Sequence, residues 1–188
     1  MSQRLEHINL AKDHPMLALL SEVKQQMGFD LNDGMLMARQ PAVAKAFAQL
    51  TKATLISGSI NPSFKRLLGL ITSSAAGCKY CISHTNYSAQ KMGESLERIE
   101  ALWTFEESPL FTEKEKSALR VAWKSASVGA EIEDNDVVEL KKYWSADEIV
   151  EIVTTISLYA YLNRFNTIFN TEIEALPKQY LENIQHKI

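Results

Sequence analysis

The chain has 188 residues, 46% of them hydrophobic, and its 20 basic and 23 acidic side chains give a net charge of −3. A chain of this length buries about 70% of its unfolded surface, so it needs neither a metal nor a disulfide to fold. The balanced charge, without a basic stripe, argues against nucleic acid or an anionic membrane as a partner. We predict one domain over residues 1–188.

The N-terminal residues 1–6 lack the apolar core of a signal peptide, and no uncharged run reaches the roughly 20 residues that span a bilayer. We therefore expect a cytoplasmic protein. In a reducing compartment, a closely spaced cysteine pair is more often catalytic or metal-binding than a permanent crosslink.

Helix signals dominate the first half of the chain, and no alternating strand pattern is present. Pro15 precedes a helical pattern that Gly28 ends, and Pro41 opens a second, alanine-rich helix. Asn61 and Pro62, an N-cap followed by the residue favoured at the first helical position, begin a third helix.

A run of small residues, 73–77, follows the third helix and ends in a glycine that allows the chain to change direction. We predict a new helix from about Cys78 to Gly93. Its first seven residues hold both cysteines of the chain and one of its four histidines, His84.

The second half carries stronger helix boundaries. Ser95 is expected to cap a helix over residues 96–103. Thr112 and Glu115 form the pattern of a capping box, which begins a helix that runs to Gly129.

Asp134 and Ser145 are the next expected N-caps. Residues 149–162 are apolar nearly all round, so this helix should be central or lie at a subunit interface. A short amphipathic helix over residues 178–185 ends the chain. The predicted fold class is all-α, and the apolar helix favours a homo-oligomer.

The motif Cys78-Lys79-Tyr80-Cys81-Ile82-Ser83-His84 carries the candidate chemistry. Cys78 and Cys81 lie three residues apart on one helical face, close enough to form a disulfide. His84 is three residues past Cys81 and shares its face, whereas it points roughly 120° away from Cys78. Because a helix N-terminus and a histidine both lower a thiol pKa, we expect Cys81 to attack a peroxide oxygen and Cys78 to complete a disulfide.

Other interpretations of the pair remain open. The cysteines could only exchange disulfides with a partner, or they could be packed as small hydrophobic residues. A structural zinc wants four ligands, and the other histidines, His7, His14 and His186, lie at the extremities of the chain. We expect no metal and no cofactor.

The small-residue run, Gly77, the Cys-x-Tyr-Cys sequence and His84, on an all-α chain, resemble the alkylhydroperoxidase AhpD-like branch of the carboxymuconolactone decarboxylase family. The sequence 163–166, Asn-Arg-Phe-Asn, is also similar to family members, and the core motif region spans about residues 41–129. The resemblance implies an AhpD-like multi-helix bundle with the Cys-x-x-Cys at a helix N-terminus, assembled as a trimer or hexamer, with a dimer left open. It implies a peroxidatic Cys81 and a resolving Cys78.

Two positions depart from the family pattern. Its best-studied members have a glutamate about twelve residues before the first cysteine as part of a proton relay, and Arg66 stands there in this chain. An arginine can stabilise a thiolate but cannot shuttle a proton. His84 also follows the second cysteine by three residues, whereas many members have four. Tyr80 and Asn163 are further relay or pocket candidates, with packing and backbone bridging as their alternatives.

The leading functional hypothesis is a thiol-dependent peroxidase or disulfide oxidoreductase. It would act on a hydroperoxide or a disulfide substrate with an external thiol or dithiol reductant. One alternative is a carboxymuconolactone decarboxylase-type lyase, although acid–base chemistry does not explain a cysteine pair. The other is a non-catalytic oligomeric redox sensor or scaffold.

Overall fold

The computed structural model describes residues 2–126, 129 and 131–184 of the chain. Within these residues it contains α-helices, one short 3₁₀ helix and no strand, so the all-α prediction is confirmed. None of the helices in the described part is long and apolar enough to cross a membrane.

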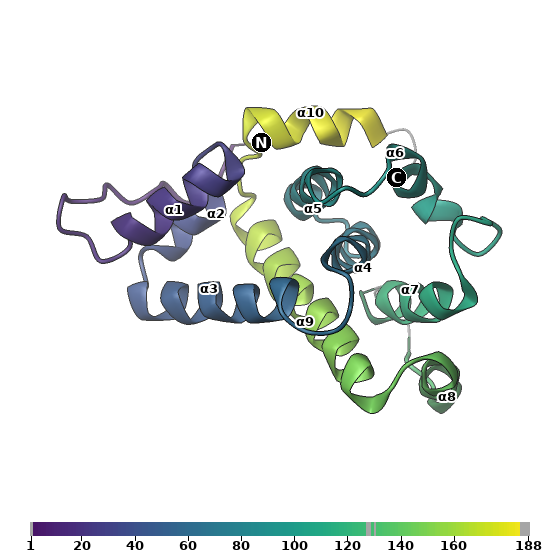
Figure 1. Cartoon of the computed structure of the whole chain (residues 1–188). Helices are drawn as coiled ribbons and strands as arrows, with labels where there is room; N and C mark the ends of the chain where they lie inside the picture. Colours follow the sequence, from purple (N-terminus) through teal and green to yellow (C-terminus); the bar gives the residue numbers. More distant parts are fainter. Residues whose placement is uncertain (1, 127–128, 130, 185–188) are drawn as a thin grey trace.

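The elements follow one another with short connections (Figure 1). In chain order they are α1 (Leu17–Met27), α2 (Asn32–Met37), α3 (Pro41–Ile56), α4 (Pro62–Ala75), α5 (Lys79–Lys91), α6 (Leu96–Glu100), the 3₁₀ helix η1 (Ala101–Thr104), α7 (Glu113–Ala126), α8 (Asp134–Tyr143), α9 (Ala146–Phe169) and α10 (Ala175–Ile184).

Helices α4 and α5 form the centre of the molecule. They pack on each other, α4 also packs on α7 and α9, and α5 packs on α10. Figure 1 shows α4 and α5 nearly end on, with α9 passing beside them, α1 to α3 on one side and α7 and α8 on the other. The main core gathers fully buried side chains from three of these helices, Leu67 and Leu68 of α4, Leu119 of α7 and Ile152 of α9.

The predicted boundaries of the first helices are confirmed. Gly28 follows α1 with φ 93°, a left-handed conformation that glycine adopts without steric cost. The Asn61 side chain accepts a hydrogen bond of 2.9 Å from the Ser63 amide at the start of α4. Gly77, with φ 69°, turns the chain between α4 and α5 and so brings the cysteines to the start of α5.

Two predicted boundaries need correction. The N-cap of α8 is Glu133 and not Asp134, because the Glu133 side chain reaches the backbone of Asp136 while the Asp136 carboxylate accepts the Glu133 amide in return. The helix after Ser95 is α-helical only to Glu100 and continues as the 3₁₀ turn η1. A tightened last turn is a common way to satisfy the terminal carbonyl groups.

Both ends of the chain also differ from expectation. Helix α2 was not predicted, since it has only six residues, contains Gly34 and has no side-chain cap. Helix α10 begins at Ala175, three residues before the predicted start, and its predicted end at residue 185 lies outside the described residues. The capping box of Ser145 and Glu148 at the start of α9 is confirmed.

Gly69 sets the closest approach of α4 to α9. A Cβ atom at this position would lie 2.2 Å from the ring of Tyr159, so any larger residue would have to displace that ring. This approach places the next turns of α9, with Leu162 and Asn166, beside the thiols of α5.

Candidate functional site

The two cysteines lie side by side where α5 begins. Cys78 is the N-cap residue of α5 and Cys81 lies in its first turn; each is 3% exposed, and both are free thiols. The Cys78 amide donates a hydrogen bond of 3.1 Å to the carbonyl oxygen of Ser73, which fixes the turn after α4. Leu162 and Ile173 pack against the pair, so the thiols sit under an apolar cover.

The thiols differ in their affinity for a proton. A hydrogen bond from the Cys81 thiol, with smaller contributions from the Cys81 amide and the Thr167 hydroxyl, lowers the pKa of Cys78 despite its burial. Burial, together with the hydrogen bond that Cys81 gives, raises the pKa of Cys81 well above that of an ordinary thiol. Of the two thiols, Cys78 is therefore the more acidic.

His84 is held by a carboxylate from a distant part of the chain. Its Nε2 lies 2.6 Å from Oε2 of Glu174, and its ring stacks on Tyr80 at 4.2 Å between centroids. The Tyr80 hydroxyl donates to Oε1 of Glu174 at 3.0 Å, and the Asn32 amide donates to the same oxygen at 2.6 Å. Both side-chain oxygens of Glu174 are thus hydrogen-bonded, and the orientation of the imidazole is fixed.

These contacts keep Glu174 ionised. Burial alone would raise its pKa, but the hydrogen bond and charge of His84, with the Asn32 amide, lower the pKa below its usual value. The pKa of Tyr80 is raised well above 10.0, mainly by burial and next by Asp33 and Glu174, so its hydroxyl stays neutral. The site therefore combines an ionised carboxylate with a neutral phenol donor.

Sequence reasoning missed Glu174 because it precedes α10, 90 residues from His84, and no local pattern marks it. It supplies a carboxylate beside the motif histidine in a chain that has Arg66 at the family's glutamate position. The Arg66 guanidinium donates instead to the Tyr159 hydroxyl at 3.1 Å, on the contact between α4 and α9.

Asp33 of α2 was also missed. Its Oδ2 lies 3.4 Å from Nδ2 of Asn166, and the same Nδ2 lies 3.6 Å from Sγ of Cys81. The Asp33 amide donates to the Tyr80 hydroxyl at 3.3 Å, which ties α2 to α5. Burial of its carboxyl group, with the nearby charge of Glu174, raises the pKa of Asp33, although His84 acts in the opposite direction.

Two asparagines of α9 bring unused hydrogen-bonding groups to the site. Asn163 and Asn166 are 4% and 2% exposed. Three of their side-chain atoms have no hydrogen-bond partner among the described residues. They are Oδ1 and Nδ2 of Asn163 and Oδ1 of Asn166. Buried polar atoms are usually paired, so these atoms are candidates to bind a ligand or water. Cys78, Cys81, Tyr80 and His84 of the predicted site lie together at the start of α5, Asn163 lies on the neighbouring helix α9, and Arg66 contacts Tyr159 of α9.

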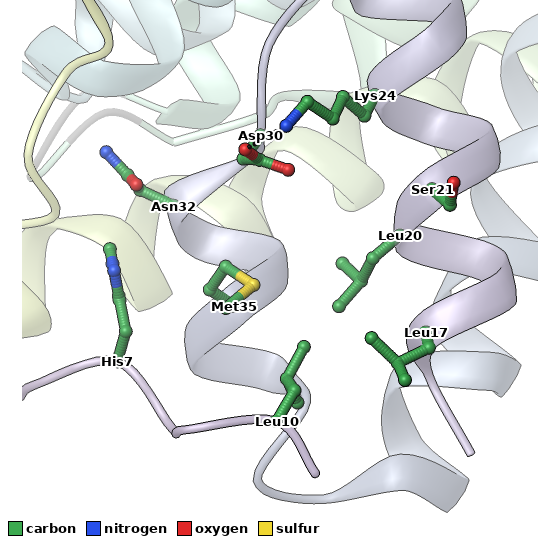
Figure 2. Close-up of a pocket in the computed structure, with 9 residues that line it drawn as sticks. All are labelled: His7, Leu10, Leu17, Leu20, Ser21, Lys24, Asp30, Asn32 and Met35. Atoms are coloured by element: carbon green, nitrogen blue, oxygen red, sulfur yellow. Dashed lines mark hydrogen bonds and ion pairs between the residues drawn. The ribbon is translucent and has the colours of Figure 1, made fainter. Parts of the chain in front are cut away.

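A pocket of about 510 Å³ opens beside α2 (Figure 2). Figure 2 shows apolar side chains from α1, α2 and the N-terminal segment pointing into it, those of Leu10, Leu17, Leu20 and Met35. The Lys24 ammonium group and the Asp30 carboxylate pair at 2.7 Å at one end. Asn32 connects this pocket to the cysteine site, since it lines the pocket and its backbone amide donates to Glu174.

In the part of the chain that the structure describes, no three metal-ligating side chains form a group that could hold an ion.

The arrangement of helices is that of an AhpD-like protein, and comparisons with known proteins agree. A family model described as "Carboxymuconolactone decarboxylase family" matches residues 41–123. This chain belongs to the carboxymuconolactone decarboxylase family.

Among solved structures, the debrominase Bmp8 is similar over nearly the whole chain. The apo structure of Bmp8 is 30% identical in sequence to this chain. The two superpose with a TM-score of 0.86 over 95% of this chain and 96% of Bmp8. A cysteine-to-alanine variant of Bmp8 in complex with 2,3,4-tribromopyrrole is 28% identical with a TM-score of 0.89, covering 98% of each chain.

Two other relatives extend the comparison. A peroxidase-related protein with an AhpD core from Ralstonia eutropha JMP134 has a TM-score of 0.81 over 95% of each chain, and at 16% identity it shows the shared fold alone. The protein YdfG of Bacillus subtilis (strain 168) is 26% identical over 127 residues, which are 67% of this chain and 86% of that protein.

Proposed function

We propose that this chain is a thiol-dependent oxidoreductase in which Cys78 and Cys81 reduce a small hydroperoxide and are regenerated by an external thiol or dithiol. The observation that carries the proposal is the pair of free, adjacent thiols at the start of α5, of which Cys78 is the more acidic. Such a pair supplies a nucleophile and a resolving group in one place.

The reaction has two steps. The Cys78 thiolate attacks the terminal oxygen of the hydroperoxide, the O–O bond breaks, and the departing alkoxide takes a proton to become an alcohol. The Cys81 thiol then attacks the sulfenic acid on Cys78, so that an S–S bond forms and water leaves. An external dithiol reduces the disulfide by exchange and is itself oxidised.

His84 and Glu174 form the base of the second step in this proposal. A thiol with a raised pKa needs a proton acceptor before it can attack, and His84 lies one turn beyond Cys81 on α5. The carboxylate of Glu174, 2.6 Å from the imidazole, stabilises the ring once it has taken the proton. This division of roles transfers the attack from Cys81, expected from the shared helical face, to Cys78.

Turnover with cumene hydroperoxide and dithiothreitol tests the proposal. We expect peroxide loss in excess of the uncatalysed rate, and loss of this excess in both Cys78→Ser and Cys81→Ser. Turnover equal to that of the double serine variant would reject the peroxidase. It would leave a sensor, which oxidises once and does not cycle.

Reductive dehalogenation of a halogenated aromatic compound is a second candidate. The supporting observation is that Bmp8, described as a debrominase and crystallised with 2,3,4-tribromopyrrole, is 28–30% identical to this chain along nearly its full length. The same thiols would serve: Cys78 takes bromine from carbon, the carbon takes a proton, and Cys81 displaces bromide as the disulfide forms. Bromide release from 2,3,4-tribromopyrrole, measured by ion chromatography with dithiothreitol present, distinguishes this activity from peroxide turnover.

A further inference from the structure

Both reactions proposed above create a strongly basic leaving group, an alkoxide or a carbanion, which must take up a proton in a buried site. We infer that Asp33 is the acid that delivers this proton, an inference that rests on the proposed function. Asp33 lies on α2, before the region that the family model matches, and no motif of the sequence marks it.

The position of Asp33 suits this role. Its carboxyl group and Sγ of Cys81 contact the same atom, Nδ2 of Asn166, at 3.4 Å and 3.6 Å. A substrate atom attacked by a neighbouring sulfur lies about 3–3.5 Å from it, and the leaving atom is one bond further away. One amide group thus separates the carboxyl group of Asp33 from Cys81, and Asp33 is also close enough to Cys78 for its charge to act on that thiol.

Two carboxyl groups of the site differ in their surroundings. Glu174 accepts hydrogen bonds from Tyr80, Asn32 and His84, which favour its ionised form. Burial of Asp33 and the nearby charge of Glu174 disfavour a second negative charge, and they outweigh His84 and the hydrogen bonds with Asn166 and Tyr80, which favour it. Carboxyl groups that environments push apart in this way divide into an ionised partner and a proton donor.

The asparagines of α9 give an independent sign that a ligand binds here. Oδ1 of Asn166 and both amide atoms of Asn163 are buried and, within the described residues, unpaired. Oδ1 of Asn166 can accept a hydrogen bond from the O–H of a hydroperoxide or the N–H of a pyrrole, while Nδ2 on the same amide contacts Asp33. A substrate bound this way lies next to the carboxyl group.

The test compares two oxidants with different leaving groups. tert-Butyl hydroperoxide releases a basic alkoxide that needs a proton, whereas peracetic acid releases acetate, which does not. Single-turnover oxidation of the reduced protein is followed by counting free thiols. Asp33→Asn should slow oxidation by tert-butyl hydroperoxide by about 10²-fold, which is the effect of losing a positioned acid. Oxidation by peracetic acid should slow by less than about 3-fold. Asp30→Asn, a surface carboxylate paired with Lys24, is the matched control and should change neither rate.

A structural or purely electrostatic role would change both rates alike, so equal effects on the two oxidants, or none, would overturn the inference. If Asp33→Asn does not fold, the pH dependence of the unmodified protein above pH 3.8 still gives an answer. The ratio of the two rates cancels the ionisation of the thiol and should fall as pH rises; a constant ratio would contradict the role of Asp33. Oxidation of the unmodified protein by neither reagent would instead reject the proposed function itself.

Discussion

Two thiols three residues apart at the start of α5 differ in acidity, because they have different hydrogen-bond partners. Cys78, at the N-cap of α5, accepts from the Cys81 thiol and from the Thr167 hydroxyl of α9, while Cys81, in the first turn of α5, donates to Cys78. The assignment of attack to Cys78 follows from these neighbours and is open to a direct chemical test.

Sulfenic-acid trapping with dimedone should distinguish the two cysteines. We expect Cys81→Ser to give a dimedone adduct on Cys78 after treatment with peroxide, and Cys78→Ser to give at least about tenfold less adduct on Cys81, because thiolate and not thiol attacks. Mass spectrometry of the peptide 78–84 locates the adduct. The reverse pattern would return the attack to Cys81 and its neighbour His84.

Variants of His84 and Glu174 test their proposed role as the base in disulfide formation. His84→Ala and Glu174→Gln should both slow formation of the Cys78–Cys81 disulfide, the first by about 10²-fold, while sulfenic acid forms on Cys78 at nearly the original rate. Stopped-flow quenching followed by dimedone labelling measures the two steps separately. An equal slowing of both steps in His84→Ala would show that the histidine acts on the attack instead.

Asp33 should also make the free energy of unfolding depend on pH. Its pKa in the folded protein is raised from 3.8, so the folded state holds a proton that the unfolded chain releases as pH rises. The contribution of Asp33 to stability is therefore greatest below pH 3.8 and is lost as pH rises toward the folded-state pKa.

Since Asp33→Asn cannot ionise, its stability relative to the original protein should increase between pH 3.5 and pH 7, even where its activity is lower. Urea unfolding at a series of pH values checks this, with the exposed Asp30→Asn as control. A difference that does not vary with pH would show that the carboxyl group titrates normally in the folded protein.

At the scale of elements, a buried ion pair holds the connection between α3 and α4 against α9. The Lys65 ammonium group, fully buried, donates to the carbonyl oxygens of Thr54 and Ser57 and lies 2.6 Å from the Glu151 carboxylate. Glu151 in turn accepts the backbone amide of Ser59. These contacts fix α9 relative to α4, and α9 carries the asparagines of the site.

Lys65→Met should destabilise the protein by about 3–5 kcal/mol, because it leaves a carboxylate and two carbonyl oxygens without their cation. Lys45→Met on the exposed face of α3 is the control and should change stability by less than about 0.5 kcal/mol. Urea denaturation of both variants measures the difference. If Lys65→Met lowers the free energy of unfolding by less than about 1 kcal/mol, the attraction between Lys65 and Glu151 only offsets the cost of burying their charges.

At the scale of the whole molecule, the long helix α9 exposes apolar side chains on the face that does not pack against the other helices. One side packs into the core through Ile152 and Ile156, while Val150 and Val153 are 64% and 45% exposed. Tyr161 continues the exposed stripe at helical spacing. Exposed apolar stripes of this kind mark interaction surfaces, and we propose that a second copy of the chain covers this one.

Light scattering at micromolar concentration should therefore find a homo-oligomer. Val150→Glu combined with Val153→Glu should shift it toward the monomer, because two carboxylates would be buried without partners. Val138→Glu on α8, an equally exposed apolar position at 50%, should leave the assembly unchanged. A monomeric original protein would contradict the proposed interface.

Local patterns in the sequence were enough for the all-α class and for most helix starts. Asn61, Gly77 and the capping box of Ser145 act on backbone groups within four residues of themselves, so their effects follow from sequence neighbours alone. The same is true of the Cys-x-x-Cys motif, whose spacing places both thiols on one turn of α5.

Only the tertiary structure decided what surrounds the thiols. Glu174 and Asp33 reach His84 and Asn166 from segments 90 and 133 residues away, through a chain path that no local periodicity encodes. The acidity of the two thiols then depends on burial, on hydrogen bonds with Thr167 and Asn166 of α9 and on the charge of Asp33, and these effects exist only once the helices have packed.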